Sequence, residues 1–209
     1  MPHECLGRFI VGEGCEGGGK STILKLIAAY LRQIGYVVVE TKEPFGEYRK
    51  RLLDTHPEIK PSPEQELDLF IRNRAEHVRE LIKPSLKKGK IVLCDRFSES
   101  TKAYQHHGRG LDLTMILAKD AQARQNISPD LTILFDIDPV IGLQRKESKN
   151  RFELENIEFH KRVRNGYLKQ AKNDPDKKWV IIDASKPAET VFEEVREAIL
   201  EFLYQHQQR

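Results

Sequence analysis

The sequence predicts a three-layer α/β fold, in which helices cover both faces of a parallel β-sheet. Five short, mainly apolar runs indicate strands, at 8–11, 36–40, 90–94, 131–137 and 179–182. These runs are continuous rather than alternating, which is typical of strands that are buried on both faces. Helical segments separate them, and this alternation predicts right-handed crossovers with ligands at the carboxyl ends of the strands.

The composition is that of one ordinary globular domain. The chain has 209 residues, of which 39% are hydrophobic and 32% are charged, and no repeat or long linker divides it. We therefore expect a single domain over residues 1–209. The net charge of +3 favours anionic ligands, but no basic stripe indicates nucleic acid. Because no membrane-length apolar stretch or targeting pattern is present, we expect a cytoplasmic protein without membrane or nucleic-acid partners.

The stretch after the first strand fits the phosphate-binding P-loop pattern, which is glycine, four residues, then Gly-Lys-Ser/Thr. Glycines allow successive backbone N–H groups to face an anionic oxygen, and a helix expected over 21–34 adds the positive end of its dipole. A flexible glycine turn is the alternative, but the flanking strand and helix favour binding of a nucleoside triphosphate. The residues concerned are Gly14, Cys15, Glu16, Gly17, Gly18, Gly19, Lys20, Ser21 and Thr22.

Within this loop, Lys20 can reach the β- and γ-phosphates of a bound triphosphate, and the Ser21 hydroxyl can coordinate Mg²⁺. Asp95 and Arg96 follow the third strand, at the same edge of the predicted sheet. They form either a structural ion pair, or an Mg²⁺ ligand (direct or through water) beside an arginine that neutralises phosphate charge.

A second set of candidates indicates an acceptor pocket. Basic residues in the loop 41–51 are either solvated or face the P-loop. Phe70 and Arg74 are four apart on the helix expected over 64–86, so they share one face. They are a core phenylalanine with a surface arginine, or an aromatic plate for a base with a guanidinium at its carbonyl edge. Polar residues that could hydrogen-bond a sugar or base follow at helical spacing: Ser100, Thr101, Tyr104 and Gln105.

The segment 145–151 is polar and basic. It is an exposed connector, or a lid that closes and brings positive charge to a transferring phosphoryl group. Positions 15–18 contain no arginine, so the P-loop cannot supply that charge itself. We therefore favour Arg145 and Arg151 as catalytic cations, with Arg96 acting from the opposite side.

Together these ordered motifs resemble the thymidylate kinase family of P-loop nucleoside monophosphate kinases, over nearly the whole chain. The resemblance implies a P-loop NTPase fold with strand order 2-3-1-4-5, usually as a homodimer. It also implies transfer of the γ-phosphate of ATP to dTMP, giving dTDP and ADP, with Mg²⁺ as cofactor.

The resemblance assigns roles on the acceptor side. Glu16 approaches the 3′-hydroxyl of dTMP, Phe70 stacks on thymine, and Arg74 contacts the base. Ser100, Thr101, Tyr104 and Gln105 read thymine and crowd the sugar 2′ position. The segment 41–46, which contains Glu43, is similar to the family motif Thr-Arg-Glu-Pro-Gly-Gly, with Lys42 and Phe45 as departures.

On the phosphate and donor sides, the resemblance places Arg49 at the monophosphate and Arg96 between the donor and acceptor phosphates. The backbone near Ala184 and Ser185, which follow the fifth strand, would border the adenine of ATP.

Three alternatives stay open. A deoxynucleoside kinase shares the acidic-Arg pair after the third strand, but it needs a base for a sugar hydroxyl rather than cations for an acceptor phosphate. Another nucleoside monophosphate kinase would differ only in the base it reads. A regulatory P-loop NTPase is the non-enzyme alternative. A GTPase of that kind should carry Asn-Lys-x-Asp and a partitioning-type ATPase an early P-loop lysine, and the sequence has neither.

Overall fold

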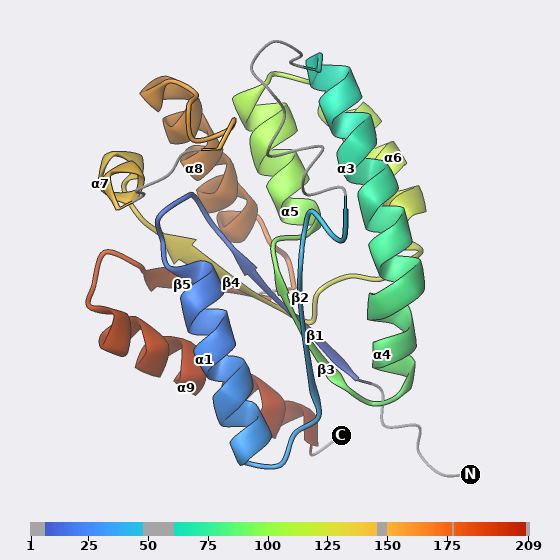
Figure 1. The fold of residues 1–209 in the computed structure, drawn as a ribbon, viewed down its shortest axis with the longest axis vertical. Helices are drawn as coiled ribbons and strands as arrows, with labels where there is room; N and C mark the ends of the chain where they lie inside the picture. The colour runs from blue at the N-terminus through green and yellow to red at the C-terminus, as the bar shows by residue number, and fades with distance from the viewer. Residues whose placement is uncertain (1–6, 48–60, 146–149, 177, 208–209) are drawn as a thin grey trace.

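A central parallel sheet organises the structure, a computed structural model that describes residues 7–47, 61–145, 150–176 and 178–207 (Figure 1). Its strand order is β2-β3-β1-β4-β5, and every neighbouring pair is parallel. The predicted fold class and strand order are confirmed, and each predicted strand ends within two residues of an observed one. The strands are β1 (Arg8–Glu13), β2 (Val38–Lys42), β3 (Ile91–Asp95), β4 (Leu131–Asp136) and β5 (Trp179–Asp183).

Helices form a layer on each face of this sheet (Figure 1). One layer consists of α1 (Lys20–Gln33) and α9 (Ala188–Gln207), which pack against each other. The other contains α3 (Pro63–His77), the π-helix η1 (Val78–Ile82), α4 (Lys83–Lys87), α5 (Ser98–Thr101), the π-helix η2 (Lys102–Gly108) and α8 (Ile157–Lys172). Helix α6 (Leu113–Arg124) packs against α3, and α7 (Pro139–Gln144) against α8. None of the helices in these ranges is long and apolar enough to cross a membrane.

The central strand β1 shows why the apolar runs do not alternate. Ile10 is buried in the core cluster that includes α1 and α9, whereas its neighbours Phe9 and Val11 are buried with Val78 and Ile82 of η1. Both faces of the strand therefore exclude water, and each buried aliphatic side chain contributes roughly 1.5–3 kcal/mol.

The helix predicted over 64–86 is three consecutive segments, α3, η1 and α4. Its start follows the expected chemistry, because the Ser62 hydroxyl accepts a hydrogen bond from the Gln65 backbone N–H and the Gln65 side chain accepts one from the Ser62 N–H. Pro63 occupies the first turn, where its missing N–H costs nothing.

Tight packing of the P-loop fixes the geometry of the site. Gly17 has a φ of 75°, and a Cβ there would lie 1.9 Å from the carbonyl oxygen of Gly142 in α7. At Gly14, φ is 134° and a Cβ would lie 2.4 Å from the Phe135 carbonyl oxygen. Only glycine fits either position, so the loop is clamped between β4 and α7 with its backbone exposed to a ligand.

Candidate active site

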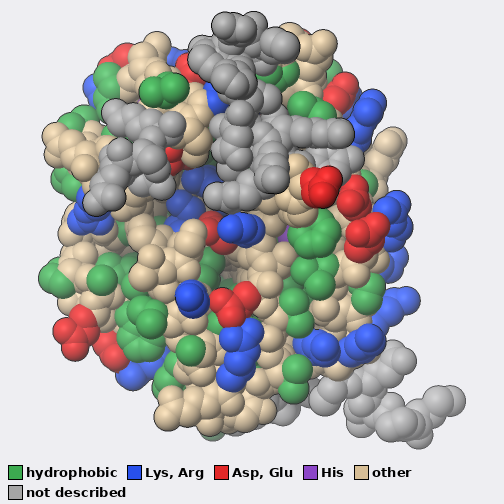
Figure 2. Space-filling view, viewed as in Figure 1, with side chains coloured by type: hydrophobic (Ala, Val, Ile, Leu, Met, Phe, Trp, Pro, Cys, Tyr) green, Lys and Arg blue, Asp and Glu red, His purple; other side chains and the backbone are tan. Residues whose placement is uncertain are grey.

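A cavity of about 440 Å³ lies at the carboxyl ends of β1, β2 and β3. Figure 2 shows this face hollowed near its centre, with Lys and Arg side chains at the rim and in its depth. The cavity brings together most of the residues that the sequence predicted: Glu16, Gly17, Gly19, Lys20, Ser21, Thr22, Glu43, Phe70, Arg74, Asp95, Arg96, Ser100, Thr101, Tyr104, Gln105 and Arg145. Gly14 and Cys15, at the beginning of the P-loop, are buried and do not line the cavity, and Arg49 is outside the described residues.

Lys20 lies within the P-loop and is only 7% exposed. Its Nζ donates a hydrogen bond of 2.7 Å to the Cys15 carbonyl oxygen. Burial and the nearby Arg96 charge lower the pKa of Lys20 to about 8. Helix α1 starts at Lys20 with Gly19 as its N-cap, and no side chain caps its first N–H groups. An anion bound here would therefore gain both the lysine charge and these free donors.

Ser21 and Asp95 lie side by side. The Ser21 hydroxyl donates to Oδ2 of Asp95, while Oδ1 of Asp95 is buried and has no hydrogen-bond partner among the described residues. An unsatisfied carboxylate oxygen beside a hydroxyl is suited to Mg²⁺, which prefers oxygen ligands. In the part of the chain described, no group of three or more His, Cys, Asp or Glu could hold a metal. A bound cation would then take most of its ligands from phosphate oxygens and water.

Arg96 is held rigidly at the cavity wall. It has a left-handed φ of 73°, and its backbone N–H donates to the Gly12 carbonyl oxygen. Its guanidinium donates to Glu16 Oε1 at 3.1 Å and to the Tyr167 hydroxyl at 3.0 Å. It also lies 5.1 Å from the centre of the Tyr104 ring. Because the side chain is still 20% exposed, a ligand can reach this preorganised charge.

Glu16 has a lowered pKa although its side chain is only 9% exposed. The Tyr104 hydroxyl donates to Oε1, and Nδ1 of the buried His160 lies 3.5 Å from Oε2. Burial raises the pKa of Glu16, but the adjacent His160 and the Arg96 charge outweigh it and hold that pKa well below its ordinary value. His160 was missed at the sequence level, because nothing in its helix distinguishes it from a core histidine.

Glu13, also missed, is fully buried at the end of β1. Its carboxyl accepts hydrogen bonds from the backbone N–H groups of Phe97 and Ser100, and from the hydroxyls of Ser100 and Tyr167. Burial, with the nearby Glu99 charge, raises its pKa to about 7. The available signal was an acidic residue at the end of an apolar strand, next to the P-loop glycine.

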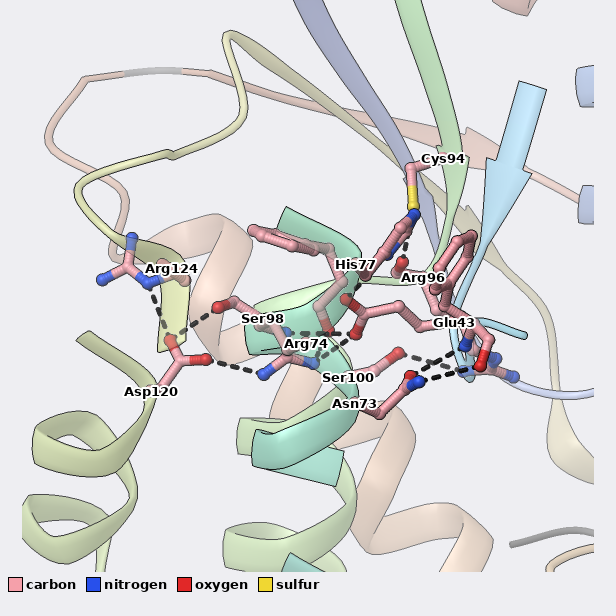
Figure 3. Close-up of polar contacts among 12 residues, drawn as sticks. Glu43, Asn73, Arg74, His77, Cys94, Arg96, Ser98, Ser100, Asp120 and Arg124 are labelled. Carbon is pink, nitrogen blue, oxygen red and sulfur yellow. Dashed lines mark hydrogen bonds and ion pairs between the residues drawn. The ribbon is translucent and has the colours of Figure 1, made fainter. Parts of the chain in front are cut away.

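Arg74 is not a surface arginine, since it is only 1% exposed. Figure 3 shows its guanidinium between two carboxylates, with the closest contact to each at 2.6 Å, to Glu43 and Asp120. It makes four hydrogen bonds, two of them to Glu43, one to Asp120 and one to the Phe97 carbonyl oxygen. His77 contacts the other Glu43 oxygen. Glu43 and Arg74 both line the cavity, where they form an ion pair with each other.

The cavity wall around Phe70 is aromatic. Phe70 is half-buried in the wall, and its ring lies 6.0 Å from that of Phe152 with a tilt of 49°. Tyr104 packs against Phe152 edge-on at 5.7 Å. Phe152, which the sequence reasoning missed, follows the predicted lid.

Arg145, at the beginning of that lid, bonds two carbonyl oxygens after β5. Its guanidinium donates to Ala184 at 2.9 Å and to Ser185 at 3.1 Å. These residues line a second hollow of about 470 Å³ together with Gly18 and Gly19. Because Arg145 also lines the main cavity, it lies where the two hollows meet.

Arg151, at the end of the predicted lid, pairs with a carboxylate of α3. It is buried, and its Nη1 lies 2.9 Å from Glu66 of α3 rather than among the residues that line the cavity. A buried carboxylate needs a cation partner, and Glu66 takes Arg151 for that purpose. The role of Arg151 at the phosphates, in a lid closed over nucleotides, stays a prediction. Residues 146–149, the centre of the predicted lid, are outside the described residues.

Comparisons with known proteins agree with this arrangement. The family model described as Thymidylate kinase matches residues 13–195. The chain is 41% identical to the thymidylate kinase of Desulfovibrio desulfuricans, over 93% of this chain and 96% of that protein. It is 45% identical to the thymidylate kinase of Pseudomonas fluorescens, over 87% of this chain and 89% of that protein.

Proposed function

Since this chain belongs to the thymidylate kinase family, we propose that it transfers the γ-phosphate of ATP to dTMP, giving dTDP and ADP. One observation carries the proposal. A single cavity holds the P-loop lysine at one end and an aromatic wall at the other, and Arg96 contacts residues of both ends. A donor triphosphate and an acceptor with a planar base can therefore occupy it together.

On the donor side, the backbone from Gly14 to Thr22 holds the phosphates of ATP and Lys20 lies against them. The adenine lies in the second hollow, bordered by Ala184 and Ser185. Arg145, which bonds both of their carbonyl oxygens, supports this border and reaches towards the nucleotide.

On the acceptor side, Phe70 stacks on thymine, and Thr101 and Gln105 lie beside the base. Glu16 accepts the sugar 3′-hydroxyl, while Tyr104 crowds the 2′ position. The dTMP phosphate faces Arg96 and Ser100, with Arg49 as a further cation proposed from the family motif. Glu43 and Arg74 hold the wall at this end.

Phosphoryl transfer needs positioning and charge rather than covalent catalysis. The Arg96 guanidinium, fixed by Glu16 and Tyr167, keeps positive charge where the acceptor phosphate meets the donor. The cationic Lys20 stabilises the negative charge that develops on the donor oxygens. Ser21 and Asp95 would hold Mg²⁺, which when bound neutralises charge on the phosphate oxygens. The family basis also leads us to propose a cytoplasmic homodimer.

A coupled ADP-release assay across a panel of acceptors tests the function. We expect dTMP to be the best acceptor, and thymidine and ribothymidine monophosphate to be poor. Preference for thymidine would instead favour a deoxynucleoside kinase. ADP release that no acceptor stimulates would favour a regulatory NTPase.

A further inference from the structure

Glu66 is a buried carboxylate that contacts Gln105 of the cavity wall. It belongs to α3, is 1% exposed, and receives three side chains from other parts of the chain. Gln105 Nε2 donates to its Oε1 at 2.9 Å, Arg109 Nε donates to the same oxygen at 3.2 Å, and Arg151 Nη1 lies 2.9 Å from Oε2.

This arrangement fixes the direction of the Gln105 amide. Glu66 pairs with two guanidinium groups, one at each oxygen, so both of its oxygens accept hydrogen bonds. The Gln105 group that faces Glu66 must therefore be the NH₂. A flipped amide would place two acceptor oxygens together in a buried site and lose a hydrogen bond, which is costly where water cannot replace it.

The opposite side of the amide is the carbonyl oxygen. Gln105 is 1% exposed and lines the cavity beside Phe70 and Tyr104. With its NH₂ held by Glu66, the group that it can offer to a base in this cavity is an acceptor. Arg74, a neighbour in the same wall, already makes four hydrogen bonds within the protein.

We propose that Glu66 is a positioning residue for base specificity: it holds the Gln105 carbonyl oxygen towards the base, so that the site selects pyrimidines with a protonated N3. Thymine and uracil carry an N3–H that donates to this oxygen. Cytosine has an unprotonated N3 at the same place, which would set two acceptors against each other. The inference rests on the proposed dTMP kinase activity.

Glu66 supports the aromatic wall as well. Through Arg151, whose guanidinium lies 4.6 Å from the centre of the Phe152 ring, it holds the residue that packs against Phe70 and Tyr104. One carboxylate thus connects the amide that reads the base with the rings beside it.

The test compares Glu66→Gln with wild type and with a matched control, Glu155→Gln. Glu155 bonds Arg109 at 2.7 Å, as Glu66 bonds Arg109, but the contacts that the structure gives Gln105 do not include it. A glutamine at 66 can accept or donate, so the Gln105 amide is free to flip. For each purified protein, kcat/KM is measured with dTMP, dUMP and dCMP at saturating ATP.

We expect Glu66→Gln to lower the dTMP-to-dCMP ratio of kcat/KM about tenfold or more, corresponding to the loss of about 1.4 kcal/mol of discrimination. The change should lie mainly in KM. The dTMP-to-dUMP ratio should stay within twofold of wild type, because both bases carry the N3–H. General damage to the pocket would change this ratio as well. Glu155→Gln should keep both ratios.

A folded Glu66→Gln protein with an unchanged dTMP-to-dCMP ratio, or with both ratios reduced alike, overturns the inference while leaving the kinase function intact. If Glu66→Gln does not fold, Gln105→Met replaces it, because it removes the acceptor directly. An unchanged dTMP-to-dCMP ratio in that variant also overturns the inference. A wild-type protein that does not phosphorylate dTMP overturns both proposals.

Discussion

Individual side chains in this cavity differ chiefly in whether the protein already uses their charge. Arg96 and Arg74 are both arginines of the cavity wall. The side chain of Arg96 is 20% exposed, whereas that of Arg74 lies between Glu43 and Asp120 and is 1% exposed. The first can therefore act on a ligand, and the second holds α3 against β2 and α6.

Replacing Arg74 with methionine should thus lower the free energy of unfolding by about 3–5 kcal/mol, because the buried Glu43 loses its arginine and Asp120 keeps only Arg124. Urea denaturation measures the loss. Arg79→Met serves as the matched control, since Arg79 belongs to the adjoining segment η1 and its side chain is 66% exposed. A stable Arg74→Met protein that has lost only dTMP affinity would show that Arg74 acts mainly on the ligand.

Lys20, unlike Arg74, is not paired with a carboxylate in the contacts that the structure gives its Nζ. Its Nζ has the Cys15 carbonyl oxygen as a substitute partner, and its cation is desolvated. Lys20→Ala should therefore leave the fold intact and reduce kcat by on the order of 10²–10³, the scale for losing one preorganised charge-stabilising donor. Turnover and circular dichroism are compared with those of Lys25→Ala, an exposed lysine of the same helix. Near-normal turnover in folded Lys20→Ala would contradict the proposed phosphate site.

Among the helices, strands and loops, the strands and the P-loop could be predicted from the sequence because their signals are local. A continuous apolar run or a glycine pattern needs no knowledge of the partner. The positions of Arg74 and Arg151 could not be predicted, because their carboxylate partners, Asp120 and Glu66, lie far away in the chain. Helical spacing placed Phe70 and Arg74 on one face, but it could not tell which charges would meet them.

Arg145, at the beginning of the predicted lid, also has partners that lie far away in the chain. Arg145 joins the end of α7 to the loop after β5 through two carbonyl oxygens. Each charge-assisted hydrogen bond contributes roughly 1.5–3 kcal/mol. Arg145→Ala should therefore raise the KM for ATP about tenfold and leave the KM for dTMP within twofold.

Steady-state kinetics with each substrate varied in turn checks this, with Lys161→Ala, an exposed lysine of α8, as the control. Equal increases in both KM values would mean that Arg145 supports the whole cavity. An unchanged KM for ATP would place the adenine elsewhere.

For the folded molecule as a unit, the most informative group is Glu13. Its carboxyl joins β1 to the backbone after β3, to α5 through Ser100 and to α8 through Tyr167. Burial, with the Glu99 charge, raises its pKa from 4.5 to about 7, even though the Arg96 charge opposes the shift. The folded state therefore binds this proton more tightly than the unfolded state does.

The free energy of unfolding therefore depends on pH. The contribution of the protonated carboxyl is fully present below pH 4.5 and is lost as the pH rises through about 7. A shift of this size corresponds to about 3 kcal/mol.

Glu13→Gln resembles the protonated form and does not titrate. From pH 5 to pH 8, the free energy of unfolding of wild type should therefore fall by about 2–3 kcal/mol relative to that of the variant. Urea midpoints at both pH values measure it, with Glu201→Gln, at an exposed position of α9, as the control. If the free energies of unfolding of wild type and Glu13→Gln differ by the same amount at both pH values, the four hydrogen bonds hold this carboxylate ionised in the folded protein. The charge of Glu13 would then not change between these pH values.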